Sequence, residues 1–249
     1  MILRDKNVLV TGGVKGIGKA LVKKLLHKGA RVGVFDTDVD GLNTLKSQST
    51  NPSCFTCDVT NYQHVETAVN QLYEEFQKID VLVNNAGMLY SAPLISITPE
   101  GLKKHDIPQW EKVISTDLSS VFYVTVNVVE KMIRTRTKGV IVNISSVSAS
   151  GNAGQSAYSA AKAGVNALTA TWAKELAPLG IRVVAVAPGY TDTESTHQAI
   201  NESILKQIVK EVPLRRLANV EEIAEGILSV MTNDFFHGKV FELDGGLVI

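Results

Sequence analysis

A glycine-rich turn near the start of the chain restricts the possible folds more than any other stretch. Residues 11–18 read TGGVKGIG and follow a short apolar run at 6–11, which is typical of a buried strand. A helical pattern comes next and stops at Gly29. A strand, a tight turn and a helix N-terminus together form a phosphate cradle, because free backbone N–H groups point at the anion. The residues expected at this cradle are Gly12, Lys15, Gly16, Ile17 and Gly18.

A carboxylate follows the next predicted strand. Residues 31–35 form a mostly apolar run that ends in Asp36, roughly 20 residues beyond the glycines. A dinucleotide-binding fold has an acidic residue there, which accepts hydrogen bonds from the adenosine ribose hydroxyls. The alternative is that Asp36 caps the next helix, and the sequence alone leaves that alternative open.

Strands and helices alternate along the rest of the chain. Further strands are expected at 53–57, 79–83, 139–144, 181–187 and 239–243, and helices at 62–77, 109–134, 156–177 and 220–231. This alternation predicts one α/β domain over residues 1–249, a Rossmann-type doubly wound parallel sheet of about seven strands with helices on both faces. Ligands bind such sheets at the carboxyl ends of the strands. The residues expected at that edge include Asp36, Asp58, Asn84, Ser146 and Pro188.

Tyr158 and Lys162 are four residues apart in the predicted helix 156–177, so they lie on one face. A free phenol titrates near roughly pH 10, and a neighbouring ammonium favours the phenolate and lowers the pKa. A tyrosine placed in this way can act as a general acid or base. The alternative is a surface lysine beside a half-buried tyrosine.

Composition excludes several classes of protein. The 249 residues carry a formal net charge of zero and no basic block, so we expect no nucleic-acid partner. No apolar run reaches the roughly 18 residues of a membrane span, and the first residues do not resemble a signal peptide. The two cysteines, Cys54 and Cys57, fit a short strand better than a redox pair or half of a metal site. We therefore expect a cytoplasmic protein without a metal.

The sequence resembles the short-chain dehydrogenase/reductase family along its whole length. The motifs that carry the resemblance are TGGVKGIG at 11–18, NNAG at 84–87, Ser146, the Tyr158/Lys162 pair and PGYTDT at 188–193. The stretch around Tyr158 is most similar to the 3-oxoacyl-[acyl-carrier-protein] reductase branch. The resemblance implies an NAD(P)(H)-dependent oxidoreductase that interconverts a ketone and a secondary alcohol. Alternatives are a dehydrogenase of a sugar, a sterol or a biosynthetic intermediate, or a non-catalytic dinucleotide-binding protein.

The resemblance also implies roles for individual residues. Tyr158 would exchange the proton of the carbonyl oxygen, Lys162 would lower the pKa of Tyr158 and bind the nicotinamide ribose, and Ser146 would hydrogen-bond the substrate oxygen. The cofactor contacts implied are Asp58 and Val59 at the adenine, Asn85, Ala86 and Gly87 at the adenine ribose, and Pro188, Gly189, Thr191 and Thr193 at the nicotinamide half. Asp58 and Thr193 have capping of a helix as an alternative role.

Departures from the family pattern carry information. Asp117 stands where the family has a catalytic Asn, and an ionised carboxylate accepts hydrogen bonds but cannot donate them. The loop before Tyr158 is short enough that Ser145 competes with Ser146, and we favour Ser146. The segment 89–109 is longer than in the reductase branch, and Val184 replaces a usual Asn.

Two further expectations concern the cofactor and the assembly. Asp36 would repel the 2′-phosphate of NADP(H), whereas Lys15 would attract it, and we favour NAD(H) while leaving NADP(H) open. The resemblance implies a homotetramer or homodimer built through the helices 109–134 and 156–177 and the last strand. The second helix would have more apolar surface than the sheet needs, at Val165, Leu168, Thr169, Trp172 and Leu176.

Overall fold

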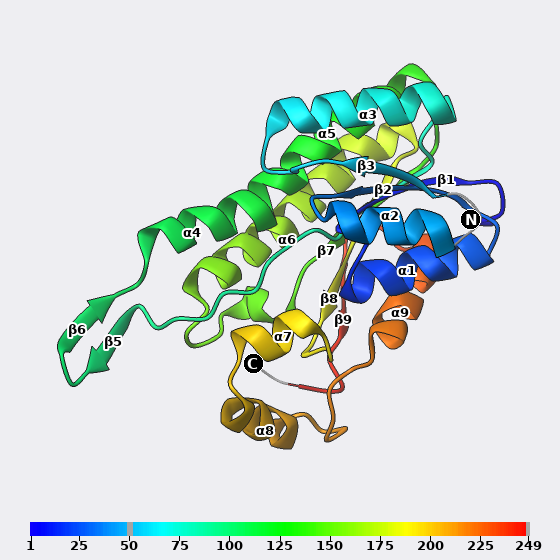
Figure 1. Cartoon of the computed structure of the whole chain (residues 1–249). Coiled ribbons are helices and arrows are strands. Elements are labelled where there is room, and N and C mark those ends of the chain that lie inside the picture. The colour runs from blue at the N-terminus through cyan, green and yellow to red at the C-terminus, as the bar shows by residue number, and fades with distance from the viewer. Residues whose placement is uncertain (49–51, 248–249) are drawn as a thin grey trace.

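The computed structural model describes residues 1–48 and 52–247. Within them, the central sheet has seven strands, all paired in parallel, in the order β3-β2-β1-β4-β7-β8-β9 (Figure 1). The strands are β1 (Asn7–Thr11), β2 (Arg31–Asp36), β3 (Ser53–Thr56), β4 (Val81–Asn84), β7 (Val140–Ile144), β8 (Arg182–Pro188) and β9 (Val240–Leu243). The predicted sheet is confirmed, and the strand order changes direction between β1 and β4, where such folds bind ligands.

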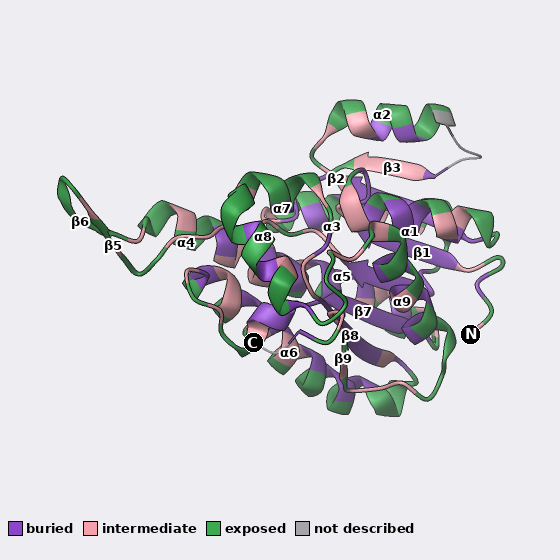
Figure 2. Ribbon diagram, turned by 90° about the horizontal axis from the view of Figure 1, so that it is seen from below, coloured by how far each residue is buried: buried purple, intermediate pink, exposed green. Residues whose placement is uncertain are grey.

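Helices cover both faces of the sheet (Figures 1 and 2). One face carries α1 (Gly16–His27), α2 (Val39–Gln48) and α9 (Val220–Thr232), and the other carries α3 (Tyr62–Phe76), α5 (Ser120–Arg134) and α6 (Ser156–Leu176). Successive strand residues point to opposite faces of the sheet. Val8 and Val10 therefore pack in the core on the side of α1, α2 and α9, and Leu9 packs in the core on the side of α3, α5 and α6. Val184, which replaces the usual Asn, is fully buried in the core on the α1, α2 and α9 side of the sheet.

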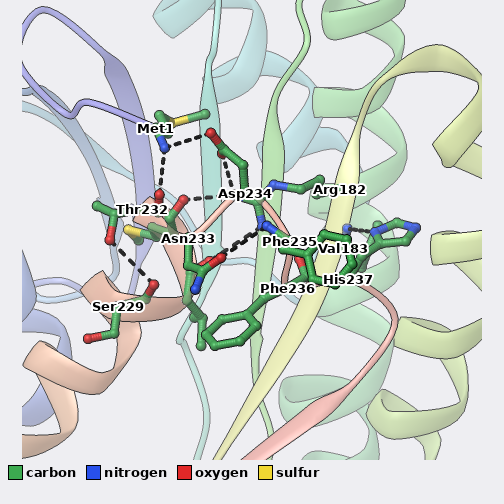
Figure 3. Close-up of polar contacts among 12 residues, drawn as sticks. Met1, Arg182, Val183, Ser229, Thr232, Asn233, Asp234, Phe235, Phe236 and His237 are labelled. Atoms are coloured by element: carbon green, nitrogen blue, oxygen red, sulfur yellow. Dashed lines mark hydrogen bonds and ion pairs between the residues drawn. The ribbon is translucent and has the colours of Figure 1, made fainter.

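The amino edge of the sheet holds the C-terminal end of α9 (Figure 3). Arg182 donates to the backbone oxygens of Met231 at 2.7 Å and Phe236 at 2.8 Å. The ammonium of Met1 donates to Thr232 O at 2.6 Å and to the Asp234 carboxylate at 3.0 Å. These cations satisfy the carbonyl groups that the last turn of a helix leaves unpaired. They stabilise the edge opposite to the one expected to bind a ligand.

The long helix predicted at 109–134 is interrupted. The structure has α4 (Ile107–Ile114), a π-helical turn at Ser115–Ser119 and then α5. The first part begins earlier than predicted because Asp106 caps it and Pro108 occupies its first turn. Such π-turns are common at functional sites. This one places Asp117 at its centre with its side chain fully buried.

The long segment 89–109 contains an antiparallel hairpin that was not predicted. Its strands are β5 (Ile95–Thr98) and β6 (Gly101–Lys104), and it extends away from the body of the molecule (Figures 1 and 2). The hairpin closes where His105 N donates to Leu94 O at 2.9 Å. Just before it, Ala92 N donates to Gly154 O at 2.7 Å, which ties the hairpin base to the turn before α6.

Further short helices connect the last strands. α7 (Glu194–Ala199) and α8 (Glu202–Glu211) follow β8, and they were not predicted; neither was α2. The expectation of surplus apolar surface on α6 is wrong. Val165, Thr169, Trp172 and Leu176 are buried in the chain itself, and the partly buried Leu168 packs against the same core. Of the two helices α5 and α6, the one with exposed large apolar side chains is α5, at Phe122, Val126 and Ile133.

Candidate active site

A cleft of about 680 Å³ opens at the carboxyl edge of the sheet. Its wall is formed by residues at the ends of β2, β7 and β8 and by the residues that directly follow β1 and β4. Every residue predicted to bind cofactor lines it, together with Ser146, so the structure brings together side chains from distant parts of the chain. Asp117 is the exception, since it lies behind the wall and is fully buried.

The glycine-rich turn packs so tightly that its glycines cannot carry side chains. A Cβ on Gly18 would lie 2.0 Å from Gly12 O, and one on Gly12 would lie 2.9 Å from Ala86 Cα. Gly12 and Gly16 adopt φ values of +66° and +50°, which favour glycine.

The N-terminus of α1 faces the cleft beside this turn. Within the described chain, no side chain caps this helix end, although Asn61 and Asn201 cap α3 and α8. Uncapped N–H groups next to glycines suit an anion such as a pyrophosphate. The geometry therefore fits the phosphates of a dinucleotide.

Acidic side chains occupy the cleft beyond the end of β2. Asp36 accepts hydrogen bonds from Val14 N at 3.3 Å and Asp38 N at 3.1 Å, so it ties the glycine-rich turn to the loop after β2. Lys15 pairs with Asp38 Oδ2 at 2.9 Å, and this hydrogen bond raises the pKa of Lys15. Asp38 was not singled out from the sequence, although its position two residues after Asp36 was a usable signal.

The residues after β3 and β4 shape the cleft beside these acids. Asp58 Oδ1 accepts from Thr60 N at 2.9 Å and Thr60 Oγ1 at 2.7 Å, which is a local turn rather than a helix cap. Asn85 Nδ2 donates to Thr11 O at 3.0 Å and Gly12 O at 2.8 Å, tying the end of β4 to the glycine turn. Val59, Ala86 and Gly87 present small or apolar surface next to them.

The far end of the cleft follows β8. Thr193 caps α7, since its hydroxyl accepts from Thr196 N at 3.2 Å. Thr191 donates to Gly189 O at 3.1 Å. The capping role weighed for Thr193 is thus present, and its side chain still lines the cleft.

Tyr158 and Lys162 lie on one face of α6, as predicted. Lys162 is buried, donates to Ile144 O at 3.0 Å, and its ammonium lies 5.5 Å from the centre of the Tyr158 ring. The expected direction of the pKa of Tyr158 is not found. Burial and the charge of Asp117 raise it above the ordinary value, while a hydrogen bond with Ser146 lowers it. The ammonium of Lys162 does not overcome the burial of the phenol.

The two candidate serines have different surroundings. Ser145 Oγ donates to Asn166 Oδ1 at 2.6 Å and packs against α6. Ser146 Oγ accepts from Ser148 N at 3.2 Å and hydrogen-bonds Tyr158. Both serines touch the cleft, but only Ser146 is directed at the phenol. This geometry favours Ser146, the serine chosen from the strand alignment.

Other residues of the cleft were missed. Tyr190 lines it and accepts a hydrogen bond from Asn152 Nδ2 at 2.7 Å, and burial raises its pKa. Met88, Leu89 and Val147 add apolar wall near Ser146. These residues carry no periodic signal, because they come from loops.

None of the helices in residues 1–48 and 52–247 is long and apolar enough to cross a membrane.

The comparison with known proteins decides the family. The short chain dehydrogenase family matches residues 6–203. The chain belongs to this family.

Relatives match this dehydrogenase along its full length. The 3-oxoacyl-[acyl-carrier-protein] reductase FabG of Thermotoga maritima is 38% identical over 256 residues, covering 100% of both chains. FabG of Chlamydia pneumoniae is 34% identical and covers 98% of both. The acetoacetyl-CoA reductase of a Synechocystis species is 36% identical, with 98% of this chain and 96% of the relative covered.

These matches place the dehydrogenase in the 3-oxoacyl-[acyl-carrier-protein] reductase branch. It is an oxidoreductase that interconverts a keto group and an alcohol with a nicotinamide dinucleotide. The uncapped helix α1 and the glycine turn beside it agree with this cofactor.

Proposed function

We propose that this dehydrogenase reduces the 3-keto group of an acyl thioester to a secondary alcohol. The observation that carries the proposal is the convergence of Ser146, Tyr158 and Lys162 at one end of the dinucleotide cleft. Apolar Met88, Leu89 and Val147 beside them suit an acyl chain. Relatives named for 3-oxoacyl and acetoacetyl thioesters support the substrate class. The alternative is a ketone of a sugar, a sterol or a biosynthetic intermediate.

The proposed reaction needs one proton and one hydride. A bound nicotinamide dinucleotide would supply the hydride for the carbonyl carbon. Tyr158 donates its phenolic proton to the carbonyl oxygen as the C–O double bond becomes single, and it takes the proton back in alcohol oxidation. Ser146 hydrogen-bonds the same oxygen, where negative charge develops. Lys162 holds the end of β7 through Ile144 O and presents positive charge near Tyr158.

The cofactor roles follow the positions of the lining residues. The cradle of residues 12–18 would hold the phosphates, and Asp36 the adenosine ribose. Asp58, Val59, Asn85, Ala86 and Gly87 would surround the adenosine, and Pro188, Gly189, Thr191 and Thr193 the nicotinamide half. The whole of 1–249 would act as a single dinucleotide-binding and catalytic domain.

We further propose that NAD(H) is the preferred form. A 2′-phosphate on the adenosine ribose would meet the carboxylates of Asp36 and Asp38. Such like-charge contact costs several kcal/mol. Lys15 is already paired with Asp38, and its side chain is 70% exposed, where an ion pair contributes only about 0–1 kcal/mol. The acidic pair therefore outweighs the lysine.

Steady-state rates with acetoacetyl-CoA, NADH and NADPH test both proposals. We expect turnover with both cofactors and a kcat/KM more than about tenfold higher with NADH, which equals about 1.4 kcal/mol. Turnover of other ketones but not of the thioester would exclude the substrate class. No turnover of any ketone would favour a non-catalytic protein, and a tenfold preference for NADPH would exclude the cofactor choice.

Matched variants separate the three acids near the end of β2. Asp36→Ala should relax the preference by weakening NADH binding. Asp38→Ala should relax it by releasing Lys15 for the 2′-phosphate. Asp40→Ala removes the same charge from an exposed position outside the cleft and should leave the preference unchanged.

We also propose a homotetramer, or at least a homodimer. Phe122, Val126 and Ile133 are 43–48% exposed on α5 and lie on one helical face. An exposed apolar face of this kind is typical of an interface between identical chains.

We propose the cytoplasm as the compartment. The two cysteines are free, and burial raises the pKa values of their thiols, which agrees with a reducing environment.

Light scattering at micromolar concentration measures the assembly. We expect the mass of four chains, and a smaller mass for Val126→Lys, because the lysine would place a charge in the contact. Leu179→Lys introduces the same charge at a similarly exposed apolar position between α6 and β8 and should not change the mass. A monomer mass for the parent protein would exclude the proposal.

A further inference from the structure

Asp117 is a buried acid that the proposed reaction does not use directly. Its side chain is fully buried in the π-helical turn between α4 and α5. Oδ1 accepts a hydrogen bond from Met88 N at 2.8 Å. Oδ2 is buried and has no hydrogen-bond partner among the described residues. An ionised carboxylate with one unpaired oxygen is costly to bury. Its negative charge therefore interacts with the charged groups closest to it in the buried site.

The nearest opposite charge is the ammonium of Lys162. A Cβ built on Gly87 would lie 2.5 Å from Asp117 Oδ1 and 3.5 Å from Lys162 Nζ, so both atoms lie beside the same point. They form no ion pair within 4 Å among the described residues, because Lys162 is held by Ile144 O. The carboxylate and ammonium therefore interact through space, across the absent side chain of Gly87.

The remaining charged groups around Asp117 are few. The π-turn packs against α4, α5 and α6. From α6, Lys162 and Tyr158 interact with it electrostatically, and the segment after β4 adds only the Met88 amide. On α4, Glu111 and Lys112 are exposed. The charged groups of α5, Glu130, Lys131 and Arg134, lie in the last turns of that helix, far from the π-turn.

We infer that Asp117 is a positioning residue whose carboxylate opposes the ammonium of Lys162 and keeps the proton on Tyr158. This inference rests on the proposed function of Tyr158 as the proton donor. Carbonyl reduction then retains its proton donor to higher pH, and alcohol oxidation, which needs the phenolate, begins at higher pH. A neutral amide at this position would keep the contact with Met88 N and lose the charge.

Asp117 also titrates itself. Burial raises its pKa to about 6, against the opposing effects of Lys162 and the Met88 amide. Below that pH the carboxyl is neutral and its effect on Tyr158 disappears. Above it, the negative charge raises the pKa of Tyr158. The parent protein and the Asp117→Asn variant therefore differ only where Asp117 is ionised and Tyr158 begins to titrate.

The experiment is the pH dependence of kcat/KM for the parent protein and Asp117→Asn in both directions. We expect the alkaline decline of reduction and the alkaline rise of oxidation both to move to lower pH by about one unit in Asp117→Asn. Reduction rates at pH 5 should be equal, because both side chains are neutral there. A uniform change at every pH, or no shift, would overturn the inference.

The matched control is Asp80→Asn. Asp80 is also a buried acid, but it lies at the amino edge, where it accepts from Asn7 N at 3.0 Å and pairs with Lys6 and Lys78. Its replacement should lower stability without moving either pH profile. Absence of turnover in the parent protein would contradict the proposed function instead, so the two failures are distinguishable.

A measurement that does not use Asp117→Asn keeps the inference testable if that variant does not fold. The difference in phenolate absorbance between the parent protein and Tyr158→Phe reports the titration of Tyr158. We expect its phenolate to appear only above the ordinary pKa of tyrosine, near roughly pH 10. Titration below about pH 8 would show that Lys162 dominates and would overturn the inference.

Discussion

Replacing Tyr158 by phenylalanine should lower kcat by about 10²–10⁴-fold and leave cofactor affinity unchanged. The change keeps the ring, which packs with Val113, Ala157 and Ala161, and removes only the hydroxyl that hydrogen-bonds Ser146. Lys162 does not replace that proton donor, since its ammonium is directed at Ile144 O. Stopped-flow turnover and NADH fluorescence titration measure the two quantities separately.

Tyr190→Phe is the matched control, because Tyr190 lines the same cleft and its hydroxyl accepts from Asn152 Nδ2. It removes a hydroxyl from the same cleft without touching Ser146. We expect a much smaller loss of kcat than in Tyr158→Phe. Equal losses in the two variants, or near-normal turnover of folded Tyr158→Phe, would show that Tyr158 is not the proton donor.

The second large effect is expected at the glycine turn. In Gly18→Ala the new methyl group would lie 2.0 Å from Gly12 O and 2.5 Å from Asn85 Nδ2. Gly12 O belongs to the backbone, so the turn itself must move. Overpacking of this kind costs about 1–3 kcal/mol, which corresponds to roughly 5- to 150-fold weaker dinucleotide binding. Isothermal titration with NADH measures the loss.

Gly226→Ala controls for the general effect of a crowded methyl group in a helix. Gly226 lies in α9, and its new methyl group would meet the end of the Leu243 side chain at 2.1 Å. The variant should lose stability in thermal unfolding and keep the affinity for NADH. Unchanged binding in Gly18→Ala would mean that the turn does not hold the phosphates.

The fold was largely predictable because its signals are local. Each strand is a short apolar run, and the polar or glycine residue after it marks the carboxyl edge. Parallel pairing then brings these ends together, so one sequence pattern predicts both the sheet and its cleft. The strand-end pattern and the family resemblance together predicted residues that line the cleft, from the glycine turn to Thr193.

What was missed depends on contacts between distant residues. The direction of the pKa of Tyr158 follows first from burial, which helical spacing to Lys162 cannot reveal, and then from Asp117, which lies on a different helical segment. The π-turn, the hairpin and the pairing of Lys15 with Asp38 are likewise set by packing or by side-chain choice. The apolar residues of α6 were assigned to an interface because their periodicity is the same whether they face the sheet or a partner.

The closure of the hairpin at its base has a consequence for how this chain can change over evolution. Since His105 N bonds to Leu94 O, the chain leaves the body and returns to it at one point. A segment joined in this way can be lengthened, shortened or exchanged without altering the path on either side. New recognition elements can therefore be acquired at β5–β6 while the catalytic scaffold is inherited intact.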